Sequence, residues 1–309
     1  MHLTLQQLKL FEAVARNNSF TRAAEELFLT QPAVSIQVQR LEDNVGLPLF
    51  DQIGKRIFLT KAGQILYDTS RDLLARLETM KKAVTDLKGE IKGSLQLAVV
   101  TTAKYFMPHL LGAFLQLYPQ VVPRLTVTNR ERVIERLTNN VDDLLIMGQV
   151  PENLGVEVYP FLENVLVVAA TPKHALVGEK NISLKRLAKE RFLAREPGSG
   201  TRLAVQRLFA EQGLKIEPYM ELGSSEAIKQ GVIAGLGLSV LSLYNLRLEL
   251  ANQHLAVLDV VGFPLRRPWY AAHLKGKQLS LVARTFLDFI LVESARILLE
   301  TTEPLSEKH

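Results

Sequence analysis

Apolar residues at the start of the chain recur at helical spacing and predict three short helices. The first covers residues 4–16. Thr21 is a predicted N-cap for the second and Thr30 for the third, with Pro32 in the first turn, where its missing N–H costs little. Gly46 supplies the stop of the third helix. Two short helices joined by a tight turn match a helix-turn-helix, whose second helix enters the major groove of DNA.

Exposed side chains on the third predicted helix suit contacts to bases and phosphates. Glutamine can pair with adenine through two hydrogen bonds, and Pro32 or Ile36 can touch a thymine methyl group. Cations and hydroxyl groups nearby would hold phosphates. The predicted DNA-contacting residues are Phe20, Thr21, Arg22, Thr30, Gln31, Pro32, Ser35, Ile36, Gln37, Gln39, Arg40, Lys55 and Arg56. Spacing alone also allows a small helical domain with an ordinary polar surface.

From Gly63 onward the apolar pattern changes to a heptad that continues for three repeats. Such a repeat fits a short two-stranded coiled coil, although an amphipathic helix packed on its own domain would show the same periodicity. The residues predicted to form a dimer seam are Leu66, Leu73, Leu77, Met80, Val84 and Leu87.

Strand and helix patterns alternate from residue 94 to residue 258, which is typical of α/β folding with parallel sheets. Ligands of such sheets bind beyond the carboxyl ends of the strands. Three strand-to-helix junctions, at residues 100–104, 195–202 and 222–226, carry hydroxyl groups, glycines or cations. Free backbone N–H groups and the helix dipole make such junctions anion sites. Routine capping could explain any one of them, but three together favour a site for an anionic metabolite.

The charge distribution supports a ligand in the second half of the chain. The chain carries 37 basic and 32 acidic residues, for a net charge of +5. Residues 1–60 hold 6 of each sign and are neutral, whereas residues 167–267 hold 14 basic and 9 acidic residues, a difference of +5. The excess therefore lies beside the glycine-rich turn at residues 195–202. A neutral DNA-binding segment is no contradiction, because charges on the docking face decide binding.

Enzymatic and metal chemistry are not indicated. The absence of cysteine excludes disulfides, thiolate metal sites and a cysteine nucleophile. The six histidines are scattered, and neither a Walker loop nor a G-x-S-x-G elbow occurs. The sequence thus predicts no catalytic residue, no metal site and no cofactor.

A soluble, cytoplasmic protein without a membrane partner is expected. Residues 1–11 lack the continuous apolar core of a signal peptide. The uncharged stretches at residues 105–123 and 230–246 are too polar and too broken for a helix that crosses a bilayer.

Several motifs occur in the order found in LysR-type transcriptional regulators. Residues 19–27, 30–35, 41–42 and 46–50 closely resemble the winged helix-turn-helix of that family, and residues 59–63 resemble its passage into a linker helix. The resemblance implies an α/β protein with two regulatory subdomains similar to periplasmic solute-binding proteins. The expected parts are a DNA-binding domain (1–60, helix-turn-helix about 20–39), a dimerising linker helix (61–90), regulatory subdomain 1 (94–165 plus 268–301) and regulatory subdomain 2 (166–267).

The resemblance also implies partners. A dimer would bind double-stranded DNA at an inverted-repeat operator, with half-sites related by the protein's two-fold axis. Association into a homotetramer and contact with RNA polymerase are further expectations. An enzyme or a pure solute-binding protein would leave the first sixty residues without a role.

Two segments look like the carbon-fixation branch of the family, residues 102–108 and 195–202. Regulators of that branch control RuBisCO or inorganic-carbon uptake genes and sense sugar phosphates, 2-phosphoglycolate, 2-oxoglutarate or reduced nicotinamide cofactor. By that likeness an activator is expected, and the predicted effector-binding residues are Thr101, Thr102, Lys104, Glu196, Ser199, Gly200, Thr201, Arg202 and Ser224. A LysR-type regulator of another pathway, with another anionic effector, is the alternative. Ile36 stands where many family members carry a basic residue.

Overall fold

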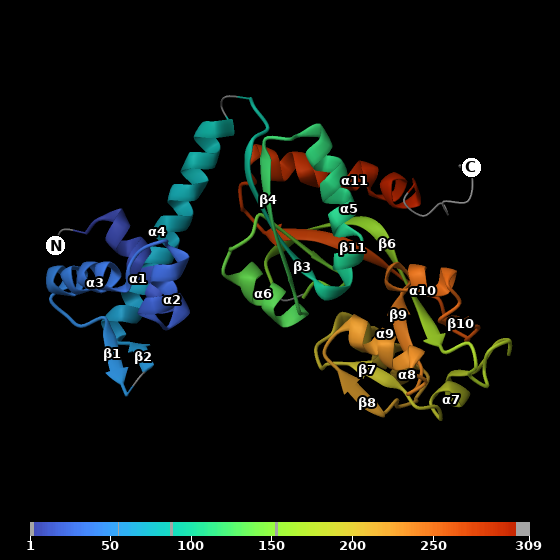
Figure 1. The fold of residues 1–309 in the computed structure, drawn as a ribbon. Helices are drawn as coiled ribbons and strands as arrows, with labels where there is room; N and C mark the ends of the chain where they lie inside the picture. The colour runs from blue at the N-terminus through green and yellow to red at the C-terminus, as the bar shows by residue number, and fades with distance from the viewer. Residues whose placement is uncertain (1–2, 55, 87–88, 152–153, 301–309) are drawn as a thin grey trace. The chain divides into compact units, whose positions relative to one another are not determined.

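The computed structural model describes residues 3–54, 56–86, 89–151 and 154–300. The chain divides into two compact units, residues 1–89 and 90–309, and each is described by itself. The first contains three short helices, a hairpin and a long helix (Figure 1). In chain order these are α1 (Leu5–Asn17), α2 (Phe20–Glu26), α3 (Gln31–Val45), β1 (Phe50–Ile53), β2 (Arg56–Leu59) and α4 (Lys61–Asp86).

Side-chain caps fix where the first helices begin. Thr4 and Gln7 form a reciprocal capping box at the start of α1. The hydroxyl of Ser19 accepts a hydrogen bond from the backbone N–H of Arg22 at 3.2 Å, so α2 begins after Ser19. The predicted cap, Thr21, was wrong: it lies inside the helix, because Ser19 is an equally good capping residue two positions earlier.

Aromatic packing and one half-buried carboxylate hold the hairpin against the helices. The ring of Phe50, at the start of β1, lies 5.3 Å from that of Phe11 in α1. The carboxylate of Glu42, in α3, accepts hydrogen bonds from the backbone N–H groups of Leu49 (2.7 Å) and Phe50 (3.3 Å). The strands β1 and β2 pair antiparallel around Gly54, whose φ is +63°. The hairpin is therefore positioned as the wing of a winged helix-turn-helix.

The second unit alternates strands and helices. In chain order its elements are β3 (Gly93–Val100), η1 (Thr101–Tyr105), α5 (Met107–Leu117), β4 (Val121–Thr128), α6 (Arg130–Thr138), β5 (Leu144–Met147), β6 (Val156–Ala170), α7 (Leu184–Leu187), β7 (Leu193–Arg195), α8 (Gly200–Glu211), β8 (Met220–Leu222), α9 (Ser225–Ile233), β9 (Ser239–Ser242), η2 (Leu243–Asn245), α10 (Arg247–Ala251), β10 (Ala256–Leu258), β11 (Leu265–Leu274) and α11 (Leu281–Glu300).

Two long antiparallel strands, β6 and β11, join two subdomains. The first subdomain (β3–β5, α5, α6 and α11) contains a parallel β4–β3–β5 arrangement, and the second (α7–α10 and β7–β10) contains the parallel pair β7–β8. The sequence predicted parallel sheets; β6, β9, β10 and β11 instead pair antiparallel, because the chain returns between the subdomains there. The predicted crossings near Asn164 and Arg267 lie opposite each other in the β6–β11 pair. The exact subdomain boundaries stay a prediction.

Separate apolar cores fill the two subdomains. Phe106, Phe114, Trp269 and Phe286 are fully buried in the first, and Phe209 is fully buried in the second. No helix in the described part of the chain is both long enough and apolar enough to cross a membrane. The predicted fold class is confirmed: an α/β chain with a winged helix-turn-helix, a long helix and two α/β subdomains.

Candidate functional site

A hollow lies between the two subdomains, where parallel strands end and helices begin. It is partly open to solvent, and its empty space measures about 420 Å³ when the open space at its mouth is included. It is called the effector hollow below, and its lining residues are Val100, Thr101, Thr102, Arg130, Met147, Gly148, Gln149, Asn164, Arg195, Glu196, Ser199, Gly200, Thr201, Arg267 and Trp269. This is the position at which open α/β sheets bind ligands.

Arg267, on β11, contributes a largely buried charge to the effector hollow. Its Nη1 donates to the carbonyl oxygen of Gly200 (3.2 Å) and its Nη2 to that of Gly148 (3.1 Å), one carbonyl from each subdomain. Among the described residues no carboxylate forms an ion pair with it. Burial, and then the nearby charge of Arg207, lowers the pKa of Arg267. A desolvated cation of this kind gains more from an anion than one in water does.

Arg130 adds a second cation of the same kind. It is the first residue of α6, and its Nε donates to the carbonyl oxygen of Gln149 at 3.3 Å. Burial lowers the pKa of Arg130. No carboxylate in the described part of the chain pairs with it.

Four buried polar atoms in the effector hollow have no hydrogen-bond partner among the described residues. They are Gln149 Oε1, Asn164 Oδ1, Arg267 Nε and Trp269 Nε1. The residues Asn164 and Trp269 are only 4% and 1% exposed. Buried polar groups are normally hydrogen-bonded, so these atoms are available to a ligand or to water. Their convergence marks the hollow as a polar binding site.

The start of α8 lies on the wall of the effector hollow. Ser199 occupies the N-cap position but makes no side-chain capping bond, and the first turn holds no acidic residue. Ser199, Gly200 and Thr201 all line the hollow. Uncapped N–H groups at the positive end of a helix dipole favour an anion at this place.

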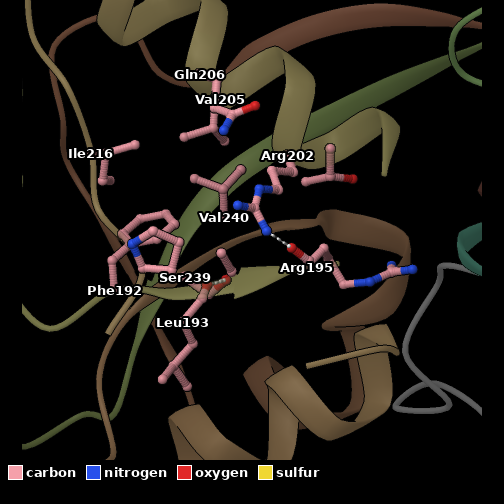
Figure 2. A pocket seen from close by; sticks show the side chains of 12 residues that line it. Phe192, Leu193, Arg195, Arg202, Val205, Gln206, Ile216, Ser239 and Val240 are labelled. Atoms are coloured by element: carbon pink, nitrogen blue, oxygen red, sulfur yellow. Dashed lines mark hydrogen bonds between the residues drawn. The ribbon is translucent and has the colours of Figure 1, made fainter. Parts of the chain in front are cut away.

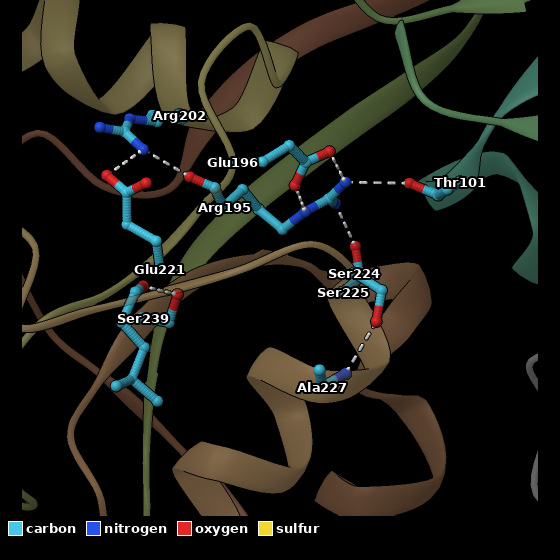
Figure 3. Close-up of polar contacts among 10 residues, drawn as sticks. Thr101, Arg195, Glu196, Arg202, Glu221, Ser224, Ser225, Ala227 and Ser239 are labelled. Carbon is cyan, nitrogen blue, oxygen red and sulfur yellow. Dashed lines mark hydrogen bonds and ion pairs between the residues drawn. The ribbon is translucent and has the colours of Figure 1, made fainter. Parts of the chain in front are cut away.

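Arg195 is occupied within the protein and does not offer a free charge. Its guanidinium makes two 2.7 Å contacts with the carboxylate of Glu196, and it donates to Ser225 Oγ at 2.7 Å and to Thr101 Oγ1 at 3.1 Å (Figure 3). Thr101 belongs to the first subdomain, so this contact bridges the hollow. With Arg130, Arg195 and Arg267 set against Glu196, the charge of the lining is +3 − 1 = +2.

A second polar bridge joins the subdomains beside the hollow. The hydroxyl of Tyr105 donates to Glu226 Oε2 at 2.8 Å, and Lys229 Nζ lies 3.0 Å from that carboxylate and 2.7 Å from Glu249. Burial alone would raise the pKa of the Glu226 carboxyl. Hydrogen bonds, led by that from Lys229, outweigh burial and hold this pKa at about 2. The carboxylate is therefore charged at any physiological pH.

The helix-turn-helix presents a polar face on α3. Gln31, Pro32, Gln39 and Arg40 are exposed, and the apolar side chain of Ile36 is 53% exposed. Gln31 Nε2 donates to Ser35 Oγ at 2.8 Å, which orients both side chains along one face of the helix. A row of exposed amide and guanidinium groups, with the half-buried hydroxyl of Ser35 beside them, suits the major groove.

Both parts of the chain match models of one protein family. Residues 5–64 match the family described as "Bacterial regulatory helix-turn-helix protein, lysR family", and residues 88–294 match "LysR substrate binding domain". The chain belongs to the LysR family. It is therefore a DNA-binding transcriptional regulator, and the hollow lies in its LysR substrate-binding domain.

Relatives of this LysR regulator include proteins of known role. The chain is 51% identical to the HTH-type transcriptional activator CmpR of Synechocystis sp., over 95% of this chain and 97% of that protein. It is 50% identical to a RuBisCO operon transcriptional regulator of Allochromatium vinosum, over 96% and 98%. Both are named as regulators, in agreement with the expectation that the chain is not an enzyme.

One solved structure resembles the regulatory unit of the LysR chain. It is the regulatory domain of CcmR from Synechocystis PCC6803, solved in complex with 2-PG. The identity is 49% and the TM-score 0.63, and the match covers 66% of this chain and 98% of that one.

Most of the effector residues predicted from the sequence line the hollow of this LysR regulator. Those that do are Thr101, Thr102, Glu196, Ser199, Gly200 and Thr201. Three predicted residues lie outside it, and the contacts of each give the reason. The ammonium group of Lys104 lies over the ring of Tyr105, 5.0 Å from its centroid. Ser224 caps α9 by accepting from the N–H of Ala227 at 3.1 Å.

Arg202 is the third predicted residue outside the hollow. Its guanidinium donates to the carbonyl oxygen of Arg195 at 2.9 Å and lies 2.7 Å from the carboxylate of Glu221 (Figure 3). It lines a neighbouring, mainly apolar pocket with Phe192, Val205 and other residues of the second subdomain (Figure 2). Its charge is thus neutralised away from the effector hollow.

The sequence missed several residues of the hollow. They are Arg130, Gln149, Asn164, Arg195, Arg267 and Trp269. A signal existed for Arg130, because it opens a helix directly after strand β4, a strand-to-helix junction of the same kind as those at residues 100–104, 195–202 and 222–226. No local signal distinguished Arg267 or Trp269.

The predicted DNA-contacting residues of this LysR regulator divide by exposure. Ser35 and Gln37 are half-buried. Phe20 is half-buried too, and its ring packs edge-on against Phe50 at 5.6 Å, so it supports the fold. Lys55 lies outside the described residues. The exposed members are Thr21, Arg22, Thr30, Gln31, Pro32, Ile36, Gln39, Arg40 and Arg56. Their contacts with DNA stay a prediction.

The predicted dimer seam on α4 contains both packed and exposed side chains. Leu66 packs against the core of its own unit, as the alternative interpretation of the heptad expected. Leu73, Met80 and Val84 are 46%, 55% and 55% exposed. Leu77 is half-buried, and Leu87 lies outside the described residues. An exposed apolar stripe along the helix is compatible with the predicted coiled coil.

Proposed function

We propose that this LysR regulator activates genes of carbon fixation or inorganic-carbon uptake, and that it responds to 2-phosphoglycolate or a similar small anion in the effector hollow. Support comes from its identity of 50–51% to CmpR and to a RuBisCO operon regulator over nearly the whole chain. Further support comes from the CcmR regulatory domain, 49% identical, whose structure contains 2-PG.

The charge of the effector hollow is the observation that carries the effector assignment. The lining has a formal charge of +2, and two of its arginines, Arg130 and Arg267, have no carboxylate partner among the described residues. A phosphomonoester bears about 1.5 to 2 negative charges at pH 7, and a carboxylate adds one. A compact dianion or trianion therefore offsets the charge that the fold leaves exposed to the hollow.

We assign anion binding to Arg130 and Arg267, with the first turn of α8 and the hydroxyl groups of Thr101, Thr102 and Thr201 completing the site. Trp269 Nε1 and Asn164 add one donor and one acceptor. Because Arg267 contacts a carbonyl oxygen of each subdomain, an anion that draws its guanidinium away changes the link between them. That change would be transmitted to the DNA-binding units.

The remaining parts of the proposal concern assembly. The exposed stripe of Leu73, Met80 and Val84 on α4 would pair with a second copy, and a dimer would bind an inverted-repeat operator with matching symmetry. Association of dimers into a tetramer, contact with RNA polymerase and action in the cytoplasm complete it.

A gel-shift and footprinting experiment on the DNA upstream of the protein's own gene tests the proposal. 2-Phosphoglycolate is expected to change the affinity or the footprint, whereas glycolate, which has the carboxylate but no phosphate, is not. Binding that ignores DNA sequence would refute the regulator, and indifference to 2-phosphoglycolate would refute the effector. A response to 2-oxoglutarate alone would instead favour a regulator with another effector.

A further inference from the structure

A second hollow adjoins the effector hollow. Its empty space measures about 470 Å³ when the open space at its mouth is included, and Gln149 and Arg267 line both hollows. The other polar residues of its lining are Arg207 and Glu211, both on α8, while aliphatic side chains of α8 and β11 form the rest. It is called the distal hollow below. The side chains of Arg267 and Gln149 are thus shared by two neighbouring spaces.

Two like charges face the distal hollow without a neutralising ion pair. Arg207 is exposed, and in the described part of the chain it has no ion pair or hydrogen bond. Its charge contributes, after burial, to the lowered pKa of Arg267. Glu211 lies one turn further along α8 but forms no ion pair with Arg207. Two arginines and one carboxylate leave the lining with a charge of +2 − 1 = +1.

The arrangement is unfavourable for the protein alone. Neighbouring guanidinium groups repel each other, and Arg267 also lacks a partner for its buried Nε. An oxyanion between Arg207 and Arg267 would relieve both effects, and guanidinium groups suit it because their N–H donors match phosphate and carboxylate oxygens. The space is large enough for such a group.

We propose that the distal hollow is a second anion subsite, formed by Arg207 and Arg267, that accepts a phosphate or carboxylate group. This rests on the proposed function for the effector hollow, which holds the first anionic group. The second group is either the far end of an elongated effector with two anionic groups or a separate small anion. The subsite distinguishes an effector whose two anionic groups are far enough apart to reach both hollows from a compact one such as 2-phosphoglycolate, whose phosphate and carboxylate both bind in the effector hollow.

Calorimetric titration of the full chain tests the subsite with three probes: 2-phosphoglycolate, fructose 1,6-bisphosphate and inorganic phosphate. The variant Arg207→Gln removes the distal charge at an exposed position. Arg186 is an exposed arginine on α7 that forms an ion pair with Glu190, and Arg186→Gln is the matched control. Arg207→Gln is expected to lower the affinity for fructose 1,6-bisphosphate by about tenfold or more and to leave the affinity for 2-phosphoglycolate within about twofold of wild type. Arg186→Gln should change neither.

The two sources of the anion give different results. An elongated effector would bind one per chain and displace 2-phosphoglycolate. A separate anion would bind at the same time as 2-phosphoglycolate, and Arg207→Gln would then abolish only the binding of inorganic phosphate. The subsite is refuted if wild-type protein binds neither bisphosphate nor phosphate, or if Arg207→Gln weakens all three probes equally or none. Failure of 2-phosphoglycolate to bind wild-type protein would refute the proposed effector, while a bisphosphate or phosphate site that depends on Arg207 would still stand.

Discussion

Replacing Arg267 with glutamine is expected to remove most of the affinity for the effector while leaving the protein folded. In the free protein the guanidinium donates to the carbonyl oxygens of Gly148 and Gly200 and carries a charge that burial disfavours. Glutamine keeps one amide donor and removes that charge. The stability lost with one carbonyl contact is offset by relief of the desolvated charge, so a change of about 1 kcal/mol or less is expected.

The loss of effector affinity follows from the type of contact removed. A hydrogen bond to a charged group is worth about 1.5–3 kcal/mol, and about 1.4 kcal/mol corresponds to a factor of ten in affinity. One charge-assisted contact between Arg267 and a phosphate oxygen therefore corresponds to roughly 10- to 150-fold in Kd. Arg267→Lys keeps the charge but not the planar pair of donors, so an intermediate loss is expected.

Calorimetric titration with 2-phosphoglycolate, together with a thermal melt, measures both quantities. Arg202→Gln is the matched control, because its guanidinium is paired with Glu221 and lies outside the effector hollow. The control should bind within about threefold of wild type, below the smallest loss expected for a charge-assisted contact. The reasoning fails if folded Arg267→Gln binds as well as wild type, or if Arg202→Gln loses as much affinity.

Three further predictions concern other parts of the molecule. Hydrogen bonds from Lys229 and other groups outweigh burial and hold the pKa of Glu226 at about 2, below the usual 4.5, so this carboxylate stabilises the fold above about pH 4.5. The difference in melting temperature between wild type and Glu226→Gln should therefore shrink as the pH falls from 4.5 towards 2, and a constant difference would contradict this. In binding assays on operator and unrelated DNA, Gln31→Ala should relax sequence preference, whereas Arg56→Ala should weaken all sites and lower the salt slope by about one unit; the reverse pattern would contradict the assigned roles. Met80→Asp on α4 should shift the full chain towards monomer in sedimentation, and an unchanged dimer would place the interface elsewhere.

The N-terminal unit could be predicted almost completely from the sequence because its signals are local. Helix periodicity, the glycine stop at Gly46 and Pro32 in a first turn all act within a few residues. The one wrong cap shows the limit of such signals. Ser19 and Thr21 are both suitable by residue type; the structure uses Ser19, and Phe20, the first residue of α2, packs against the core.

The site in the regulatory unit could be predicted only in part. Thr101 and Ser199 could be predicted because each follows the carboxyl end of a strand that pairs parallel, β3 in one sheet and β7 in another, and ligands of α/β sheets bind beyond such ends. Arg267 and Trp269 lie on a strand that pairs with β6, about a hundred residues earlier, and their pattern is that of any half-buried strand. Only the long-range pairing shows that they face the hollow.

The position of the excess positive charge in the sequence pointed to an anion site in the regulatory unit, but the size of that excess does not show which cations face the effector hollow. Residues 167–267 carry +5, yet several of their cations, such as Arg186 and Arg202, are paired with carboxylates and do not face the effector hollow. Arg130, which does face it, lies outside that segment and in a region whose charge gave no hint. What distinguishes Arg130 and Arg267 is that the fold removes water from them without supplying a carboxylate. Because electrostatic interactions strengthen as water is excluded, two such arginines favour an anion more than a larger number of solvated lysines would.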